Sequence, residues 1–84
     1  MEKSKKDNIY STSNLFLAAS LLTKNLRLID TKLNERSLGI FYFEDRPDRE
    51  ELVRKYFDGT LEGSFKRFIN CLAELRDNVT ALRS

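Results

Sequence analysis

The sequence predicts a small α+β domain in which an antiparallel β-hairpin packs with three helices. Three segments carry apolar residues at helical spacing, and two shorter runs rich in β-branched and aromatic residues flank one polar loop. A chain of 84 residues has room for one domain. We expect a flexible polar tail over residues 1–8 and a single domain over residues 9–84, with the order (β)-α-β-β-α-α. The strand in parentheses is an optional third one, with two candidate segments, Ile9-Tyr10 and Thr60-Leu61-Glu62.

The first helix is expected over residues 14–24, directly after a cluster of hydroxyl side chains. Thr12 or Ser13 can accept hydrogen bonds from the unpaired amides of its first turn. The segment is apolar over most of its circumference, so this helix should be the most buried of the three. Asn25 suits the left-handed conformation with which many helices end.

Two runs rich in β-branched and aromatic residues follow the first helix and predict the hairpin. We expect strands over residues 26–31 and 37–43. The polar segment between them, residues 32–36, makes a loop of about five residues.

The second strand of this hairpin is apolar on both sides. Leu38, Ile40 and Tyr42 point one way, while Phe41 and Phe43 point the other. A hairpin strand with one solvated face normally alternates apolar and polar residues. We therefore expect both faces of this strand to be covered, either by helices of the same chain or by a partner.

The second helix is expected from Pro47 to Phe57. Proline is favoured in the first turn of a helix, because an amide there would have no partner. Acidic side chains follow at the positive end of the helix dipole, and Gly59 suits the end of the helix.

The third helix begins after Ser64, whose hydroxyl suits an N-cap. Cys71 lies at the edge of its apolar stripe, where a packed and unreactive thiol is expected. The stripe follows the helical period and is expected to face the core. It consists of Phe65, Phe68, Ile69, Leu72, Leu75, Val79 and Leu82.

Several of these residues, taken in order, resemble a known family. They are Tyr10-Ser11-Thr12-Ser13 before Leu15-Phe16-Leu17-Ala18-Ala19, then Leu28, then Phe41-x-Phe43-Glu44-Asp45 before Pro47, and Phe68-x-x-x-Leu72-x-x-Leu75. Over residues 9–80 the chain resembles a family of small uncharacterised bacterial and phage-borne domains, known only as a domain of unknown function. It departs from that pattern at Asn14, where members tend to carry Asp, and at Asn25, where they tend to carry Gly. The resemblance implies no activity and assigns no functional residue.

The composition argues against catalysis. The chain has no histidine and one cysteine, so it lacks the commonest general base and metal ligand, and it lacks a thiol–imidazole pair. Its three glycines are scattered, and none belongs to a phosphate-binding loop. We expect no enzyme activity, no catalytic residues and no cofactor.

We also expect a cytoplasmic protein that does not insert into membranes. A secreted domain of this size would normally carry several cysteines, and the first residues lack the apolar segment of a signal peptide. The longest apolar run, from Leu15 to Leu22, is too short to span a bilayer.

An acidic cluster surrounds the start of the second helix and is a candidate cation site. Mg²⁺ accepts one or two carboxylates together with water. Acidic residues at a helix start are also what the helix dipole favours, and Arg46 and Arg49 are ready counter-charges. We assign no metal and leave open whether a cation binds these residues, which are Glu44, Asp45, Asp48, Glu50 and Glu51.

Two functions suit such a domain. The first is a protein-binding module, with self-association as a symmetric dimer as one form of it. If no helix crosses the outer side of the hairpin, Leu38, Ile40 and Tyr42 form an exposed apolar patch, which on a small protein usually marks an interface.

The second function is that of a nucleic-acid-associated accessory protein. Basic residues interleave with aromatic ones in two helices, and such a pattern can bind a phosphate backbone while rings stack on bases. The candidate contacts are Arg54, Lys55, Lys66 and Arg67, with Lys3, Lys5 and Lys6 adding a salt-sensitive attraction. The net charge of +2 is nearly balanced, which makes this the alternative rather than the preferred hypothesis.

Overall fold

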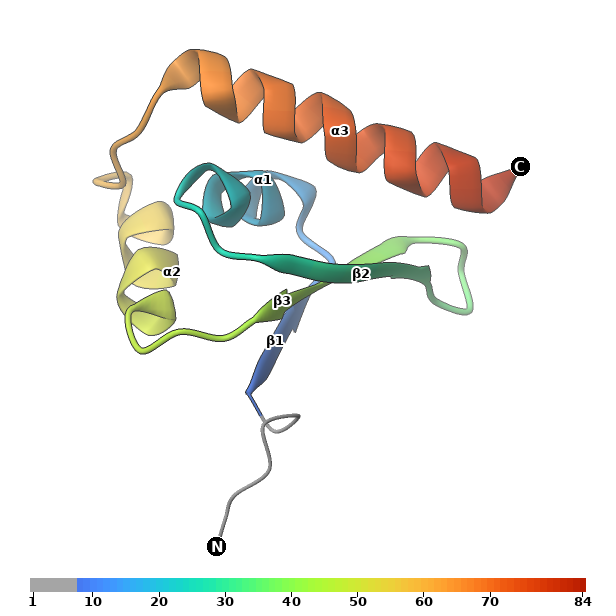
Figure 1. Cartoon of the computed structure of the whole chain (residues 1–84), viewed down its shortest axis with the longest axis horizontal. Helices are drawn as coiled ribbons and strands as arrows, with labels where there is room; N and C mark the ends of the chain where they lie inside the picture. The colour runs from blue at the N-terminus through green and yellow to red at the C-terminus, as the bar shows by residue number, and fades with distance from the viewer. Residues whose placement is uncertain (1–7) are drawn as a thin grey trace, which may run out of the picture.

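The computed structural model describes residues 8–84, and its three strands form one antiparallel sheet in the order β1-β3-β2 (Figure 1). The α+β class and the order β-α-β-β-α-α predicted from the sequence are confirmed, and the third strand comes from the Ile9-Tyr10 segment. Apart from Asn8, the predicted tail lies outside the described residues. The elements are β1 (Ile9–Thr12), α1 (Leu15–Thr23), β2 (Leu28–Leu33), β3 (Gly39–Glu44), α2 (Arg49–Asp58) and α3 (Phe65–Arg83).

The hairpin of β2 and β3 lies about two residues later than predicted, because Asn34 determines its turn. The Asn34 Oδ1 accepts hydrogen bonds from the amides of Arg36 and Leu38 at 2.8 and 3.0 Å. The Asn34 amide donates to the Leu38 carbonyl at 2.9 Å, and Ser37 takes up a left-handed conformation with φ 64°. The polar run predicted as a loop therefore begins inside β2.

The inner face of the sheet carries the core. Phe41 and Phe43 of β3 are 1% and 0% exposed and share one buried cluster with residues of α1 and α3. Leu26, predicted to lie in a strand, joins this cluster just after α1 ends. Gly39 lies where α3 passes closest to the sheet, since a Cβ there would be 2.5 Å from the Val79 Cγ2. Both α1 and α3 lie on this side of the sheet, and α2 packs chiefly against α1 (Figure 1).

Helix α1 is the most buried helix, as predicted. Its N-cap is Asn14 rather than Thr12 or Ser13, because the Asn14 Oδ1 accepts from the Leu17 amide at 3.1 Å. The Thr12 Oγ1 accepts from the Asn14 amide at 3.1 Å and so holds the capping residue in place. Asn25 takes up the predicted left-handed conformation, with φ 73°.

Helices α2 and α3 begin and end close to the positions predicted from the sequence. Helix α2 begins at Arg49, two residues after the predicted start, and buries Leu52. It ends at Gly59 with φ 80°, as predicted. Helix α3 begins after Ser64, whose hydroxyl accepts from the Arg67 amide at 3.1 Å.

The predicted core stripe of α3 is wrong for three of its seven residues. Cys71, Leu75 and Val79 are buried, and Phe68 and Leu72 pack against them. The exposed members of the predicted stripe are Phe65 at 78%, Ile69 at 44% and Leu82 at 45%. Phe65 and Leu82 lie in the first and last turns of α3, whereas the buried residues of this helix lie between Cys71 and Val79.

Candidate functional site

Within residues 8–84, one face of the sheet carries no helix. Residues paired directly across an antiparallel ladder share a face, so the register places Ser11 and Asp30 beside Tyr42, Lys32 beside Ile40, and Ile9 beside Glu44. All of these side chains point away from the inner face that holds Phe41 and Phe43. We call the surface made by six of them the open sheet face: Ile9, Ser11, Asp30, Lys32, Ile40 and Tyr42. Of the two alternatives expected for this strand, covering of both faces by helices of the same chain is therefore wrong for the described residues, and covering by a partner stays a prediction.

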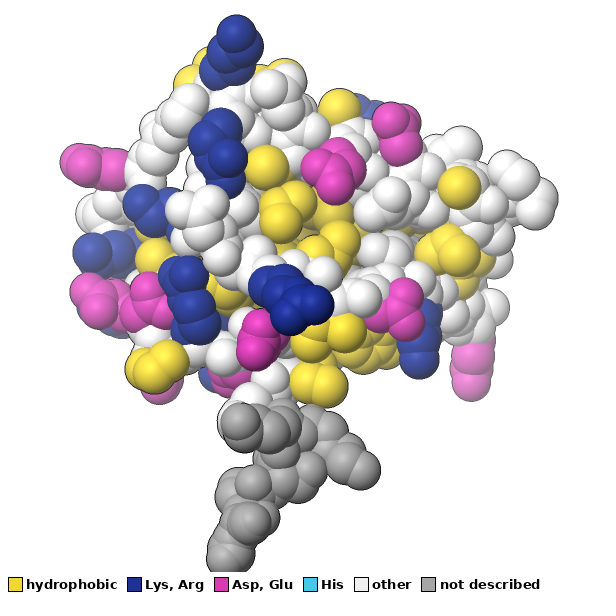
Figure 2. Space-filling model, in the orientation of Figure 1, with side chains coloured by type: hydrophobic (Ala, Val, Ile, Leu, Met, Phe, Trp, Pro, Cys, Tyr) yellow, Lys and Arg dark blue, Asp and Glu magenta, His cyan; other side chains and the backbone are white. Residues whose placement is uncertain are grey.

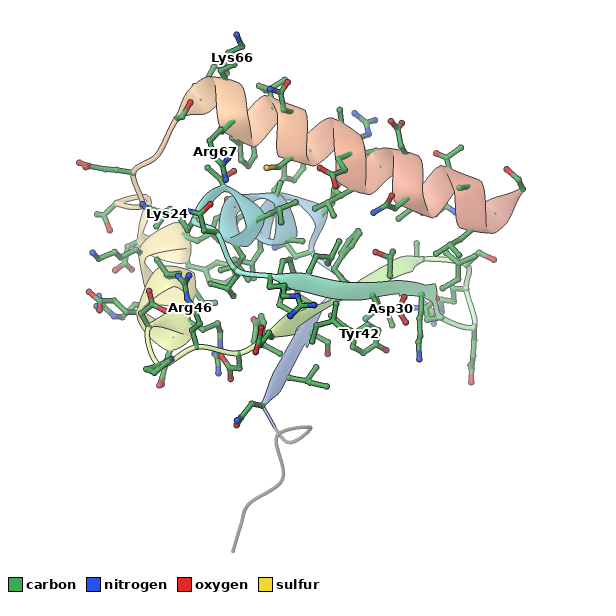
Figure 3. The ribbon with its side chains drawn as sticks, viewed as in Figure 1. Lys24, Asp30, Tyr42, Arg46, Lys66 and Arg67 are labelled. Carbon is green, nitrogen blue, oxygen red and sulfur yellow. The ribbon has the colours of Figure 1, made fainter. Side chains whose placement is uncertain are left out.

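The open sheet face has an apolar centre and a charged edge. Ile40 and Tyr42 on the central strand are half-buried between the flanking strands, while Ile9 on β1 is 44% exposed. The Lys32 Nζ lies 5.6 Å from the centroid of the Tyr42 ring, within cation–π range. Asp30 is exposed on the same strand as Lys32 (Figure 3). Hydrophobic side chains gather below β2 with charged groups at their margin (Figure 2).

The structure brings together only two of the three residues predicted as the interface. Ile40 and Tyr42 lie on the open sheet face, but Leu38 precedes β3 in the turn. Leu38 lines a depression of about 340 Å³ together with Val79 and Arg83 of α3. The left-handed Ser37 redirects the chain just before it, which the alternating pattern does not reveal.

A basic cluster lies across the end of α1 and the start of α3. It consists of Lys24, Arg46, Lys66 and Arg67, which run down one side of the molecule (Figure 3). In the space-filling view their dark-blue side chains form a column on the same side (Figure 2). Lys24 at the end of a helix has a local signal, since cations are favoured there, whereas nothing in the local sequence indicates the position of Arg46.

Arg67 and Arg46 bind the carbonyl groups that end α1. The Arg67 Nη2 donates to the carbonyls of Leu22 and Thr23 at 3.3 and 3.2 Å, and to the Asn25 Oδ1 at 2.9 Å. The Arg46 Nη2 donates to the Lys24 carbonyl at 3.3 Å. The last carbonyls of a helix have no partner within the helix, and they carry the negative end of its dipole. The two guanidinium groups therefore cap α1.

Phe65 and Lys24 line a depression beside this cluster. It has a volume of about 190 Å³, and Ser64, Phe65 and Phe68 form one side of it. The Phe65 ring is 78% exposed although it was predicted to be a core residue. The Lys24 Nζ donates to the Glu62 carbonyl at 3.0 Å, which fixes the lysine at the opposite side.

The four predicted nucleic-acid contacts fall into two separate pairs. Arg54 and Lys55 lie on α2 with their charges paired: Arg54 with Asp58 at 3.6 Å, and Lys55 with Glu51 at 3.4 Å. Lys66 and Arg67 lie on α3 and take part in no ion pair among residues 8–84. Of these two pairs, the second thus presents positive charge that no ion pair within residues 8–84 compensates.

Arginine side chains bind two residues of the acidic cluster, Asp45 and Asp48. The Arg49 Nε and Nη2 donate to the two carboxylate oxygens of Asp45 at 3.0 and 3.3 Å, and Arg46 donates to Asp48 at 3.0 Å. The hydrogen bond from Arg49 holds the pKa of Asp45 below its ordinary value, and partial burial opposes this shift. Within residues 8–84, no group of three or more His, Cys, Asp or Glu side chains is placed to hold a metal ion.

Arg49 also links the sheet to α2. Its guanidinium carbon lies 4.3 Å from the centroid of the Tyr10 ring on β1. Asp45, at the end of β3, donates its amide to the Asn8 carbonyl at 2.9 Å. This network gives Asp45 and Arg49 a structural role that accounts for their charges.

These features define the class: a small α+β domain whose described part, residues 8–84, has the open sheet face on one side and a basic cluster on another. The chain belongs to the family described as Domain of unknown function (DUF5659), whose profile matches residues 7–81. The family resemblance noted in the sequence is thereby confirmed. No curated protein and no solved structure matches the chain significantly. Over residues 8–84, no helix has both the length and the hydrophobicity that crossing a bilayer requires.

Proposed function

We propose that this protein is a non-catalytic protein-binding module that associates with a second copy of itself through the open sheet face. The observation that carries the proposal is the arrangement of β2 and β3. Asp30 lies beside Tyr42, and Lys32 lies beside Ile40, on a face that no helix of residues 8–84 covers. Opposite charges on the margin of an apolar centre are the pattern of an interface with a polar rim.

The spacing of these residues makes the face complementary to itself. Asp30 and Lys32 are two residues apart on one strand, with Thr31 and Phe41 at the level between them. Consider a two-fold axis between two such faces, perpendicular to the strands and passing at that level. It sets Asp30 of each copy opposite Lys32 of the other, and Tyr42 opposite Ile40. An interface of two-fold symmetry requires this kind of self-complementary surface.

The size of the face indicates a weak dimer. Three strands spaced at about 4.8 Å and about six residues long cover roughly 15 by 20 Å. A standard stable interface buries about 800 Å² on each partner. The open sheet face is smaller, so we expect a dissociation constant in the micromolar range or above.

We place this function in the cytoplasm. Cys71 is buried on α3 and is the only cysteine in the chain, so the fold contains no internal disulfide. Small domains that work in oxidising compartments normally depend on several disulfides.

Sedimentation velocity over a range of protein concentrations tests the self-association. We expect the weight-average mass to rise from monomer toward dimer as concentration increases, and Ile40→Lys to abolish the rise. A wild-type protein that stays monomeric throughout the range would remove the proposal.

Reversing charges tests the specific pairing. Asp30→Lys and Lys32→Asp should each weaken the homodimer, because each places like charges opposite one another. An equimolar mixture of the two variants should form a heterodimer, since every facing pair is then attractive. Glu35→Lys, at the exposed hairpin turn, is the matched control and should associate like the wild type. Equal association of the mixture and of each variant alone would contradict the two-fold arrangement.

A further inference from the structure

We propose that the surface formed by Lys24, Phe65, Lys66 and Arg67 binds single-stranded nucleic acid, with Arg67 holding a phosphate and Phe65 stacking on a base. This surface lies at the start of α3 and the end of α1 and shares no residue with the open sheet face. The self-association proposed above and this activity are therefore independent.

Arg67 is held ready to bind an anion. All three of its hydrogen bonds to the end of α1 leave from one nitrogen, Nη2. Within the part of the chain that is described, its Nη1 and Nε donate to no other group. A guanidinium fixed through Nη2 keeps Nη1 as a donor, and its N–H groups can bind a single phosphate oxygen.

The charges around Arg67 favour an anionic partner. Lys66 follows Phe65 on α3, and the ammonium of Lys24 is fixed by the Glu62 carbonyl on the other side of the depression. None of the ion pairs over residues 8–84 involves Lys24, Lys66 or Arg67. The acidic residue nearest to them along the chain, Glu62, is exposed and belongs to the segment that lines the depression.

Phe65 selects nucleic acid over an acidic peptide. Its ring is 78% exposed at the first residue of α3, so the core gains little from it. An exposed ring beside cations is the arrangement by which proteins stack on unpaired bases while binding the backbone. An acidic peptide would use the cations and make no use of the ring. A paired duplex keeps its bases stacked on one another, so the ring favours a single strand.

Fluorescence anisotropy tests the proposal with labelled single-stranded DNA and RNA of about 12 nucleotides at roughly 50 mM salt. We expect the logarithm of the association constant to fall linearly with the logarithm of the salt concentration. The slope should be about −2, which corresponds to about three neutralised phosphates on a single strand. Phe65→Ala should weaken binding about tenfold, and Lys66→Ala should weaken it several-fold. Glu62→Gln should strengthen it, because a negative charge is removed from the segment that lines the depression.

Matched variants on α2 distinguish binding at this surface from non-specific electrostatic binding to the protein as a whole. Phe57 is 67% exposed and Lys55 is paired with Glu51, so Phe57→Ala and Lys55→Ala should leave binding unchanged. Circular dichroism melting of Phe65→Ala should match the wild type, since the ring is exposed. No binding at low salt, or an equal effect of Phe65→Ala and Phe57→Ala, would overturn the proposal. Displacement of the oligonucleotide by polyglutamate of the same length would overturn it in favour of an acidic peptide.

Discussion

Arg46 and Arg67 bind the same residue, Asn25, from two different parts of the chain. The Arg46 Nη1 donates to the Asn25 carbonyl at 3.3 Å, and the Arg67 Nη2 donates to the Asn25 Oδ1 at 2.9 Å. Asn25 is the left-handed residue that turns the chain from α1 into β2. The two arginines therefore tie the segment before α2 and the first turn of α3 to the end of α1.

Removing the Arg67 guanidinium should destabilise the fold modestly. Arg67→Met keeps the apolar stem but loses three hydrogen bonds to the end of α1. Bonds to charged groups contribute about 1.5–3 kcal/mol when well buried. Because Arg67 is exposed, we expect a loss of only about 1 kcal/mol in the free energy of unfolding, measured by urea titration. Lys66→Met, on the neighbouring residue, should change this free energy by less than about 0.5 kcal/mol. Equal losses for both variants would argue against the capping role.

Adding one methyl group at Gly39 should also destabilise the protein. The Cβ of Gly39→Ala would lie 2.5 Å from the Val79 Cγ2, so β3 and α3 must move apart. Overpacking of this kind costs about 1–3 kcal/mol. Thermal unfolding should show the loss, while Gly63→Ala, whose Cβ would lie 3.4 Å from the Thr23 Cγ2, should be tolerated.

A double variant shows whether contact with Val79 causes the loss in Gly39→Ala. If the clash is with Val79, the double variant Gly39→Ala/Val79→Ala should lose less free energy of unfolding than the two single variants lose when their losses are added. Additive losses would mean that the cost of Gly39→Ala arises elsewhere.

Acidic pH should lower the free energy of unfolding, in part because the Asp45 carboxylate becomes protonated. Its pKa in the folded protein lies below the ordinary value of 3.8, first because Arg49 donates hydrogen bonds to the carboxylate. A carboxyl group with a lowered pKa contributes stability that is fully present above its ordinary pKa. That stability is lost as the pH falls through the lower pKa of the folded state. Urea titrations from neutral pH to about pH 2 should therefore show a smaller decline for Asp45→Asn than for the wild type.

A surface carboxylate is the control for this prediction. Asp58 pairs with Arg54 at 3.6 Å, and its side chain is 53% exposed. Exposed pairs contribute about 0–1 kcal/mol, so Asp58→Asn should follow the acid dependence of the wild type. If Asp45→Asn does the same, the Asp45–Arg49 pair does not account for acid sensitivity.

Local sequence signals predicted those features of the fold that depend on neighbouring residues. Asn25 and Gly59 take up the left-handed conformations expected of them, and Ser64 caps α3. The hairpin was misplaced because the Asn34 side chain competes with strand pairing for the amides of Arg36 and Leu38. That competition is decided by side-chain hydrogen bonds, which an alternating pattern does not report.

Features that depend on distant segments were not predictable from the sequence. Of the candidate interface residues, Ile40 and Tyr42 share the open sheet face, while the turn places Leu38 beside α3. Lys66 and Arg67 were proposed together as nucleic-acid contacts, but the binding of Arg67 to the end of α1 depends on how two helices pack. Periodicity indicates which residues share a helix face, and the partner helix decides how much of that face is buried.

Two residues of α3 test whether packing, rather than helical periodicity alone, decides which apolar side chains are buried. Leu75 and Ile69 belong to the same predicted stripe, yet Leu75 is 0% exposed and Ile69 is 44% exposed. Leu75→Ala should lower the free energy of unfolding by about 2–5 kcal/mol, because it removes buried methyl groups and leaves a cavity. Ile69→Ala should cost less than about 1 kcal/mol, since much of its side chain already contacts water. Urea titration of both variants measures the difference. Equal losses would mean that α3 buries the whole predicted stripe and is rotated about its axis relative to the arrangement described here.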